Sequence, residues 1–305
     1  MSQTNTASAS IIEQPSKTAS SNLANWILLG VLALIWGSSF ILVKKSLVLF
    51  DVLQVGSLRI FSAFLFFVPV FIYRFSKIPR EKWGYFLLSG LLGNLFPALL
   101  FSYAGKHMDS AVSGALNSLT PLFTLLIGAT VFGSIITRRQ TLGIILGFMG
   151  SLFLIFVGAK NSVSLNGYAV FVVLATIMYG INLNVIKKNL GGYDPIMITT
   201  CIFMTIGPIA AMILFSGDFV EKVRNTNDLM PLVYGSLLGV MGSAIAMMLF
   251  NKLIQKTSAV LASSVTYLIP IVAILWGLLD SEAILFQHYL GMSIILIGVY
   301  LVNKK

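Results

Sequence analysis

Long runs of apolar residues, separated by short polar stretches, follow one another along the chain from about residue 26. A helix needs about 20 such residues to cross the hydrocarbon core of a bilayer. Runs of this length predict helices, because a backbone inside lipid must satisfy its own hydrogen bonds. Ten segments qualify and predict an all-α integral membrane protein with ten transmembrane helices: 26–43, 52–73, 83–105, 110–132, 139–157, 167–186, 195–216, 231–254, 258–279 and 286–302.

The composition agrees with this pattern and excludes a soluble enzyme. Of the 305 residues, 57% are hydrophobic and 10% are charged, and the mean hydropathy is +0.92. Soluble domains carry about 25% charged residues. The single cysteine, Cys201, excludes an intramolecular disulfide. Residues 1–24 begin with a long Ser-, Thr-, Asn- and Gln-rich stretch, so we expect a flexible tail and no signal peptide.

The distribution of positive charge predicts the orientation in the membrane. The net charge is +10, from 20 Lys and Arg against 10 Asp and Glu. Ten spans place both termini on one side. That side collects thirteen of the basic residues, the other side has six, and Arg59 lies within a span. Basic loops stay in the cytoplasm. We therefore expect a multi-pass protein of the plasma (bacterial inner) membrane, with both termini in the cytoplasm and no nucleic-acid partner.

The two halves of the chain resemble each other. Aromatic, Lys, Gly and Pro positions recur in the same order, at an offset of 143 and then 149 residues: Trp36 with Tyr179, Lys44 with Lys187, Gly93 with Gly242, and Pro121 with Pro270. We predict two domains, 25–158 with the first five spans and 166–303 with the last five. Because five is odd, the two repeats must be inverted relative to each other. Inverted repeats are typical of secondary transporters with a central site.

Several motifs identify a family resemblance. They are WGSSF ahead of Lys44, LRIFSAFLF in the second span, the proline-centred SAVSGALNSLTPLF and SAVLASSVTYLIPIV, and Glu282, Gln287 and Gly291 around the last span. Together they resemble the drug/metabolite transporter (DMT) superfamily, and within it the EamA-type transporters with two EamA repeats. Ser134 departs from the pattern, since the first repeat would carry an acidic residue there. The resemblance implies a membrane carrier of small metabolites, whose substrates vary widely between members.

Polar and aromatic side chains in the middle of the spans are the candidate substrate-binding residues. Each polar group there must be satisfied by protein, water or substrate, and together they suggest a central cavity. They are Trp36, Asn94, Asn117, Tyr179, Asn182, Ser243, Thr266 and Tyr267. A structural role is the alternative for each, because Asn and Ser in membrane helices often bond only to a neighbouring helix.

Three further residues are candidates for structural or gating roles. Arg59 is the only charged residue well inside a span, about 10 Å from its start, and either bonds to carbonyls and water or contacts substrate. Pro121 and Pro270 shape the fourth and ninth spans and each free a backbone carbonyl. No Asp or Glu lies in a span interior. We expect Glu282, at the outer edge, to be solvated, which disfavours a mechanism that exchanges protons for cations.

The fifth and tenth spans have small residues in place of polar ones. Gly143, Gly147 and Ser151 are spaced by four, a spacing that permits close helix contact. We expect these spans either to pack within a monomer or to form a homodimer. The other expected partners are a small-molecule substrate and the membrane lipids.

These observations predict a secondary transporter that moves small organic metabolites by alternating access, with amino acids or related solutes as cargo and export as the direction. A carrier of another solute class (a drug, nucleobase or vitamin-like compound) is one alternative. A membrane enzyme on lipid or isoprenoid substrates is another, and it would need a nucleophile with a base, or carboxylates that bind metal. The two histidines, His107 and His288, lie at span ends, where we expect solvated residues. We therefore expect no metal and no cofactor.

Overall fold

The fold is a bundle of helices. The computed structural model describes residues 18–74, 80–133, 135–156, 167–257, 262, 264–282 and 285–303, and all regular elements in these ranges are helical. The helices are α1 (Thr18–Ser46), α2 (Val52–Arg74), η2 (Arg80–Lys82), α3 (Trp83–Gly90), η3 (Leu91–Leu95), α4 (Phe96–Gly105), α5 (Ser110–Asn117), α6 (Thr120–Thr130), α7 (Arg138–Phe156), α8 (Ala169–Val185), η4 (Ile186–Leu190), α9 (Pro195–Phe215), α10 (Phe219–Asn225), α11 (Met230–Leu237), η5 (Leu238–Ile245), α12 (Ala246–Lys256), η6 (Ser264–Tyr267), α14 (Ile269–Leu279) and α15 (Phe286–Asn303).

Seven helical stretches of the described chain are long and apolar enough to cross a bilayer. They correspond to the first four predicted spans and to the sixth, seventh and eighth. α7 occupies the fifth predicted span, while α14 and α15 provide shorter apolar helices at the ninth and tenth. A helical membrane protein is therefore supported. The count of ten and the inversion of the repeats stay predictions.

The start of the chain differs from the expected tail. Residues 1–17 lie outside the described part of the chain, but α1 begins at Thr18, several residues ahead of the first predicted span. Extending an existing helix adds one hydrogen bond for each residue that it fixes. The long apolar part of α1 can therefore support a polar first turn and a half.

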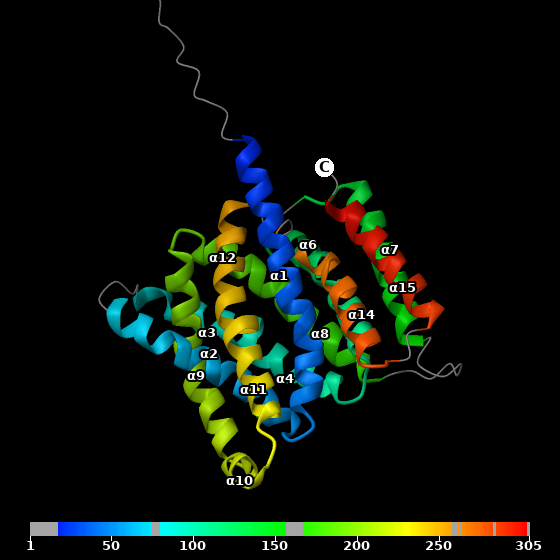
Figure 1. Ribbon diagram of the computed structural model, residues 1–305. Coiled ribbons are helices and arrows are strands. Elements are labelled where there is room, and N and C mark those ends of the chain that lie inside the picture. Colours follow the sequence, from blue (N-terminus) through cyan, green and yellow to red (C-terminus); the bar gives the residue numbers. More distant parts are fainter. Residues whose placement is uncertain are drawn as a thin grey trace, which may run out of the picture.

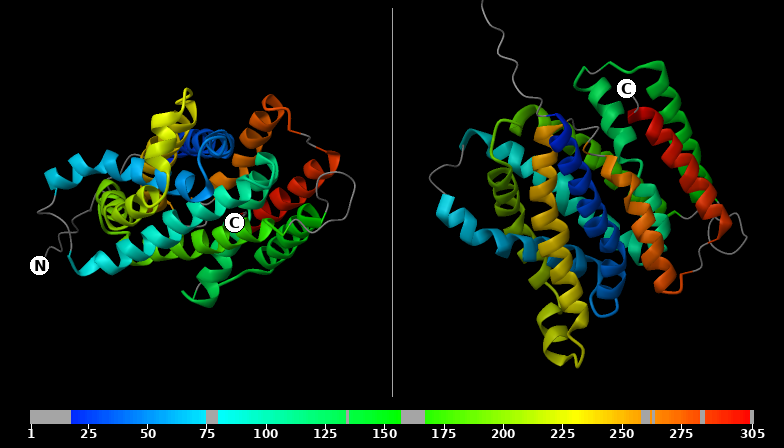
Figure 2. Two further views of the ribbon diagram at one scale, coloured as in Figure 1. Left: turned by 90° about the horizontal axis from the view of Figure 1, so that it is seen from below. Right: turned by 45° about the horizontal axis from the view of Figure 1, so that its top comes forward.

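The bundle is built from helix pairs that are distant in sequence. α2 packs along α9, α6 along α8, α1 along α14, and α7 along α15. The views of Figures 1 and 2 agree that α7 and α15 lie side by side at one edge. α1 begins and α15 ends at the same end of the bundle, at the top of Figure 1. The C-terminal end of α1, which carries Lys44, lies at the opposite end.

Glycines allow the close contact between α7 and α15. A Cβ atom added to Gly298 would lie 2.5 Å from the backbone nitrogen of Gly147 and 2.6 Å from the carbonyl oxygen of Gly143. A Cβ atom on Gly150 would lie 2.9 Å from the carbonyl oxygen of Gly291. The small residues of the fifth and tenth spans therefore pack against each other within one chain. A homodimer stays a prediction and would have to use other faces of these helices.

Burial in this bundle is suited to lipid outside and polar groups inside. Trp26, Leu34 and Ile72 are large apolar residues whose surfaces are 60% to 70% exposed. Asn94, Asn117 and many Ser and Thr residues are buried instead. A water-soluble domain of this size would not expose so much apolar surface over its helices. The polar interior is where a site can form.

Candidate functional site

A cavity of about 100 Å³ lies inside the bundle, and residues from both halves of the chain line it. Six of the eight candidate binding residues line this cavity, and so does Arg59: Trp36, Asn94, Asn117, Tyr179, Asn182 and Thr266. Ser243 bonds to Arg59 at its edge. The side chain of Tyr267 lies outside the described residues. The fold thus gathers most of the predicted set around one space, and their role toward a substrate stays a prediction.

Two π-helical stretches, η3 and η5, interrupt the third and eighth spans beside the cavity. They carry Asn94 and Ser243, which occupy equivalent positions of the two repeats. π-helical turns are rare and occur frequently at functional sites. Each stretch also holds a glycine on the cavity wall, Gly93 and Gly242.

The fourth and ninth spans are broken near their middles. α5 ends at Asn117 and α6 begins at Thr120, so that Pro121 occupies the first turn of α6. Pro270 occupies the same place in α14, just after η6 with Thr266. Proline is tolerated in the first turn of a helix because its missing N–H has no intrahelical acceptor there. Both prolines therefore mark helix starts, and Ser118 Oγ joins the breaks by donating to the Thr266 carbonyl oxygen, at 2.8 Å.

Aromatic side chains form rigid walls of the cavity. Trp36 Nε1 donates a hydrogen bond to the carbonyl oxygen of Gly242, at 2.8 Å, and its ring meets Phe250 edge-on at 4.8 Å between centroids. Tyr179 stacks on Phe101, with centroids 6.0 Å apart. Such pairs fix ring positions through edge-to-face and offset contacts. Trp36 thereby links α1 of the first half to η5 of the second.

Asn182 combines a place on the cavity wall with a packing role. Ser89 Oγ donates a hydrogen bond to Asn182 Oδ1. The amide also fills the space beside Gly93, where an added Cβ atom would lie 2.1 Å from Asn182 Nδ2. Asn182 therefore ties α8 to α3 and η3, as the structural alternative for such residues proposes.

Three other polar groups on the cavity wall have no hydrogen-bond partner. Asn94 Nδ2, Ser113 Oγ and Asn117 Oδ1 are buried atoms that no described residue contacts within hydrogen-bond distance. Buried polar groups almost always have a partner, in the protein or in bound water and ligand. These groups therefore have hydrogen-bonding capacity that the described protein does not use, and contact of Asn94 and Asn117 with a substrate stays a prediction.

Arg59 reaches the cavity from α2 and is held by the second half of the chain. Its Nε atom donates to Ser243 Oγ at 2.6 Å. Gly239 lies directly on the backbone of the same residue, since an added Cβ atom would come within 2.5 Å of the Arg59 carbonyl oxygen. Arg59 thus has a side-chain hydroxyl as its partner, and the first sequence hypothesis, bonding to carbonyls or water, stays a prediction. The second, contact with substrate, stays open.

Several wall residues were not among the candidates although helical spacing points to them. Ser39 follows Trp36 by three residues, while Ser113 precedes Asn117 by four and Thr120 follows it by three; all three line the cavity. Residues three or four apart share one helix face. Extending each candidate along its own face would have found them.

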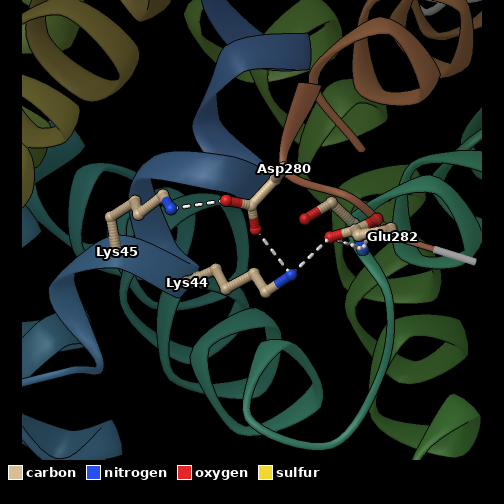
Figure 3. A network of polar contacts seen from close by, with 5 residues as sticks. Lys44, Lys45, Asp280 and Glu282 are labelled. Carbon is tan, nitrogen blue, oxygen red and sulfur yellow. Dashed lines mark hydrogen bonds and ion pairs between the residues drawn. The ribbon is translucent and has the colours of Figure 1, made fainter. Parts of the chain in front are cut away.

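Charged residues close the end of the bundle at which α1 ends. Lys44 Nζ lies 2.8 Å from Asp280 Oδ2 and 2.9 Å from Glu282 Oε1, and Lys45 pairs with Asp280 (Figure 3). The backbone N–H of Ser110, the first residue of α5, donates to both Glu282 oxygens at 3.1 and 3.2 Å. We call these five residues the Lys44 network. It joins α1 and α5 of the first half to the chain between α14 and α15.

The expectation that Glu282 is solvated is wrong. Its side chain is 1% exposed, because Lys44 and the start of α5 cover it. Asp280 in the same network is more accessible, and hydrogen bonds from Lys44 and then Lys45 lower its pKa. Asp109 precedes Ser110 in the chain. Burial, followed by the nearby Glu282 carboxylate, raises the pKa of the Asp109 carboxyl group. The pKa values of Asp280 and Asp109 are thus shifted in opposite directions.

At the opposite end of the bundle, the described partners of the equivalent lysine are backbone carbonyls. Lys187, the repeat partner of Lys44, donates to the carbonyl oxygens of Ile254 and Thr257, both at 2.9 Å. These carbonyls belong to the C-terminal end of α12, where cations are favoured by the helix dipole. The position equivalent to Glu282 is Ser134, which lies outside the described residues.

The two histidines have different surroundings. His107 is exposed and stacks on Tyr168 at 4.0 Å between ring centroids, in line with a solvated position. His288 is 6% exposed, and its Nδ1 accepts the backbone N–H of Leu285, so the expectation of a solvated residue is wrong there. Among the described residues, no group of three or more His, Cys, Asp and Glu side chains is arranged to hold a metal ion.

Comparison with known proteins assigns both halves of the chain to the same kind of unit. The sequence model described as the EamA-like transporter family matches residues 24–156 and again residues 166–304. Together the two matches cover nearly the whole chain. The predicted domains run over closely similar ranges.

Individual relatives are distant but align over most of their length. An uncharacterized transporter of Archaeoglobus fulgidus is 24% identical over 93% of this chain and 100% of its own. The uncharacterized inner membrane transporter YedA of Escherichia coli K12 is also 24% identical, over 89% of this chain and 88% of its own. A WAT1-related chloroplastic protein of Arabidopsis thaliana is 25% identical, over 88% of this chain and 66% of its own.

The fold is similar to that of a solved crystal structure. That structure covers 92% of this chain and 96% of its own, with a TM-score of 0.66 and 15% sequence identity. At this identity the similarity concerns the fold alone. It agrees with the arrangement of helices that surrounds the cavity.

Proposed function

The chain belongs to the EamA-like transporter family and is a multi-pass membrane transporter of the drug/metabolite type, and from this premise we propose that it is a secondary carrier of small organic metabolites, with amino acids or related solutes as cargo. We propose export across the plasma membrane as its direction. The family fixes the general activity, while the cavity supports the choice of solute.

The central observation is the cavity that both halves of the chain line. Its walls combine aromatic rings with amide and hydroxyl groups, and three of the buried polar atoms have no partner among the described residues. Ligand sites are typically apolar with a few placed polar groups. A small organic solute with both an apolar and a polar part fits this description.

We propose that the carrier works by alternating access between two inverted repeats of five spans. Lys44 and Lys187 are equivalent in the repeats and lie at opposite ends of the bundle. Lys44 is bonded to the second half of the chain, whereas Lys187 is bonded to the end of α12 within its own half. In our proposal the Lys44 end faces outward and both termini face the cytoplasm. Release to the outside would then break the Lys44 network.

Transport by purified protein in liposomes tests this function. Liposomes with and without the protein are compared for uptake of labelled amino acids, nucleobases, vitamins and cationic drugs. Trp36→Ala and Asn117→Ala should slow uptake of an accepted solute by about tenfold, the equivalent of roughly 1.4 kcal/mol. Trp26→Ala is the matched control, because Trp26 lies on the same helix and is 66% exposed. If no solute crosses faster than in empty liposomes, the carrier proposal is refuted.

A further inference from the structure

We propose that Arg59 binds a carboxylate group of the transported solute, so that the cavity selects monoanionic acid groups over amides and amines. This inference rests on the proposed function, since it names the chemical class of solute for the same cavity. It is carried by the charge balance of the cavity and by the unused hydrogen-bonding atoms of its wall.

The charge of Arg59 has no counter-ion in the described structure. Among the described lining residues Arg59 is the only charged one, and no described carboxylate lies within ion-pair distance of it. A guanidinium carries five N–H donors, and only Nε has an acceptor among the described residues, the Ser243 hydroxyl. The two terminal nitrogens therefore keep their donors for a ligand. A charge inside a membrane protein normally has such a partner.

The position of Arg59 suits a fixed binding group better than a solvated one. It lies seven residues into α2, about 10 Å from the start of the helix by helical rise. Ser243 holds the guanidinium from η5, and Gly239 permits that helix to lie directly on the Arg59 backbone. A group fixed in advance loses little entropy when it binds.

Unpartnered amide and hydroxyl groups supply the second observation. Asn94, Ser113 and Asn117 are 7%, 2% and 7% exposed, and each has a buried side-chain atom without a partner. They line the same cavity as Arg59. Such groups can complete the hydrogen bonds of a carboxylate and of a second polar group on the solute.

The chemistry of Arg59 selects among anions. A planar guanidinium matches a carboxylate with two parallel hydrogen bonds. A single carboxylate also neutralises the single positive charge, whereas a dianion such as a phosphate monoester would leave one negative charge unpaired. An amine would place a second positive charge beside the first. A carboxylate is therefore the group that leaves the fewest buried charges without a partner.

Binding to the detergent-purified full chain tests the inference independently of transport. Thermal shift is measured with the protein amino acids and with small mono- and dicarboxylates. Each acid that shifts the wild type is then compared with its own amide and its decarboxylated amine, for example L-phenylalanine, L-phenylalaninamide and phenylethylamine. We expect carboxylates to bind at least tenfold more tightly than the other two. Arg59→Gln should abolish this preference, and Arg59→Lys should restore part of it.

The matched control is Arg74→Gln, since Arg74 lies on the same helix, α2, in an exposed pair with Asp194. It should bind like the wild type. Arg59→Lys keeps the charge, so a loss with Gln and a partial return with Lys separates binding from misfolding. Equal binding of acid, amide and amine to the wild type, unchanged binding by Arg59→Gln, or no carboxylate in the panel that binds would each overturn the inference.

The liposome assay separates failure of this inference from failure of the proposed function. If carboxylates bind through Arg59 but no solute crosses, the carrier proposal fails and the carboxylate site stands. If amines or neutral solutes cross and Arg59→Gln leaves their uptake unchanged, the carboxylate site fails and the carrier stands.

Discussion

Glu282→Ala should destabilise the protein more than the removal of an exposed carboxylate does. The Glu282 side chain is 1% exposed and accepts hydrogen bonds from Lys44 Nζ at 2.9 Å and from the N–H of Ser110 at 3.1 Å. The alanine variant leaves the first N–H of α5 without its acceptor. Lys44 keeps Asp280 as a partner.

The magnitude follows from these two contacts. A hydrogen bond to a charged group contributes about 1.5–3 kcal/mol when it is buried, which is the case for Ser110. The pair with Lys44 is discounted to about 0.5 kcal/mol, because the Lys44 side chain is 38% exposed and solvent screens it. The sum is about 2–3.5 kcal/mol. With roughly 2 °C per kcal/mol for a large chain, the melting temperature should fall by about 5 °C.

Thermal unfolding in detergent measures this effect. Glu221→Ala is the control, since Glu221 is exposed on α10, and an exposed substitution changes stability by about 0.5 kcal/mol or less. If Glu282→Ala melts together with Glu221→Ala, the reasoning that this carboxylate holds the end of the bundle is refuted.

The same substitution tests whether the Lys44 network closes the cavity. Cys201 is fully buried, so a single Ser113→Cys substitution on the cavity wall gives one accessible reporter for a polar maleimide. Weakening the closed state by more than 1.4 kcal/mol raises the open population at least tenfold when that population is small. Labelling should therefore be at least tenfold faster with Glu282→Ala. Equal labelling rates would show that the Lys44 network does not control access to the cavity.

Two further predictions concern packing and pH. Gly298→Ala should lower the melting temperature strongly, because its Cβ atom would lie 2.5 Å from the backbone nitrogen of Gly147. Gly30→Ala is the control and should have little effect, because nothing lies within 4 Å of an added Cβ atom there. Equal melting temperatures of the two variants would contradict the packing of α7 on α15. Asp109→Asn should raise the melting temperature at pH 7. Burial and then Glu282 raise the pKa of Asp109 above 3.8, so the ionised carboxylate lowers the stability of the folded protein as the pH rises through that pKa. The gain from the substitution should therefore vanish when the melts are repeated below pH 3.8.

Sequence periodicity anticipated the helices better than it anticipated their interruptions. A run of about 20 apolar residues predicts a spanning helix for a simple physical reason, and seven such helices lie where they were expected. The π-helical stretches around Asn94 and Ser243 carry no distinct pattern, although each holds a glycine, Gly93 or Gly239, that lies close against another helix. Pro121 and Pro270 were expected only to shape the fourth and ninth spans, and the helix breaks two or three residues ahead of them were not predicted.

The polar residues of the site could be gathered from span depth, but their partners could not. Depth in the span alone makes Trp36 and Asn182 equally good candidates for substrate binding. The structure separates them, since Trp36 bonds a carbonyl across the two halves while Asn182 is engaged by Ser89. Glu282 was misjudged because solvation was inferred from its place at the edge of a span. Contact with Lys44, 238 residues away in the sequence, decides its burial.

The two ends of the bundle are built from equivalent lysines with unequal partners, and this difference bears on how the carrier would be controlled. Lys44 is held by carboxylates that exist only in the second repeat, while Lys187 is held by helix-end carbonyls that do not titrate. Carboxylate pairs weaken with acid and salt, and carbonyl contacts depend on neither to the same degree. Acid or salt should therefore loosen the contacts of Lys44, at its end of the bundle, more than those of Lys187. Under our proposed orientation that is the outward end, so the repeat symmetry is broken where the protein meets the variable outside solution.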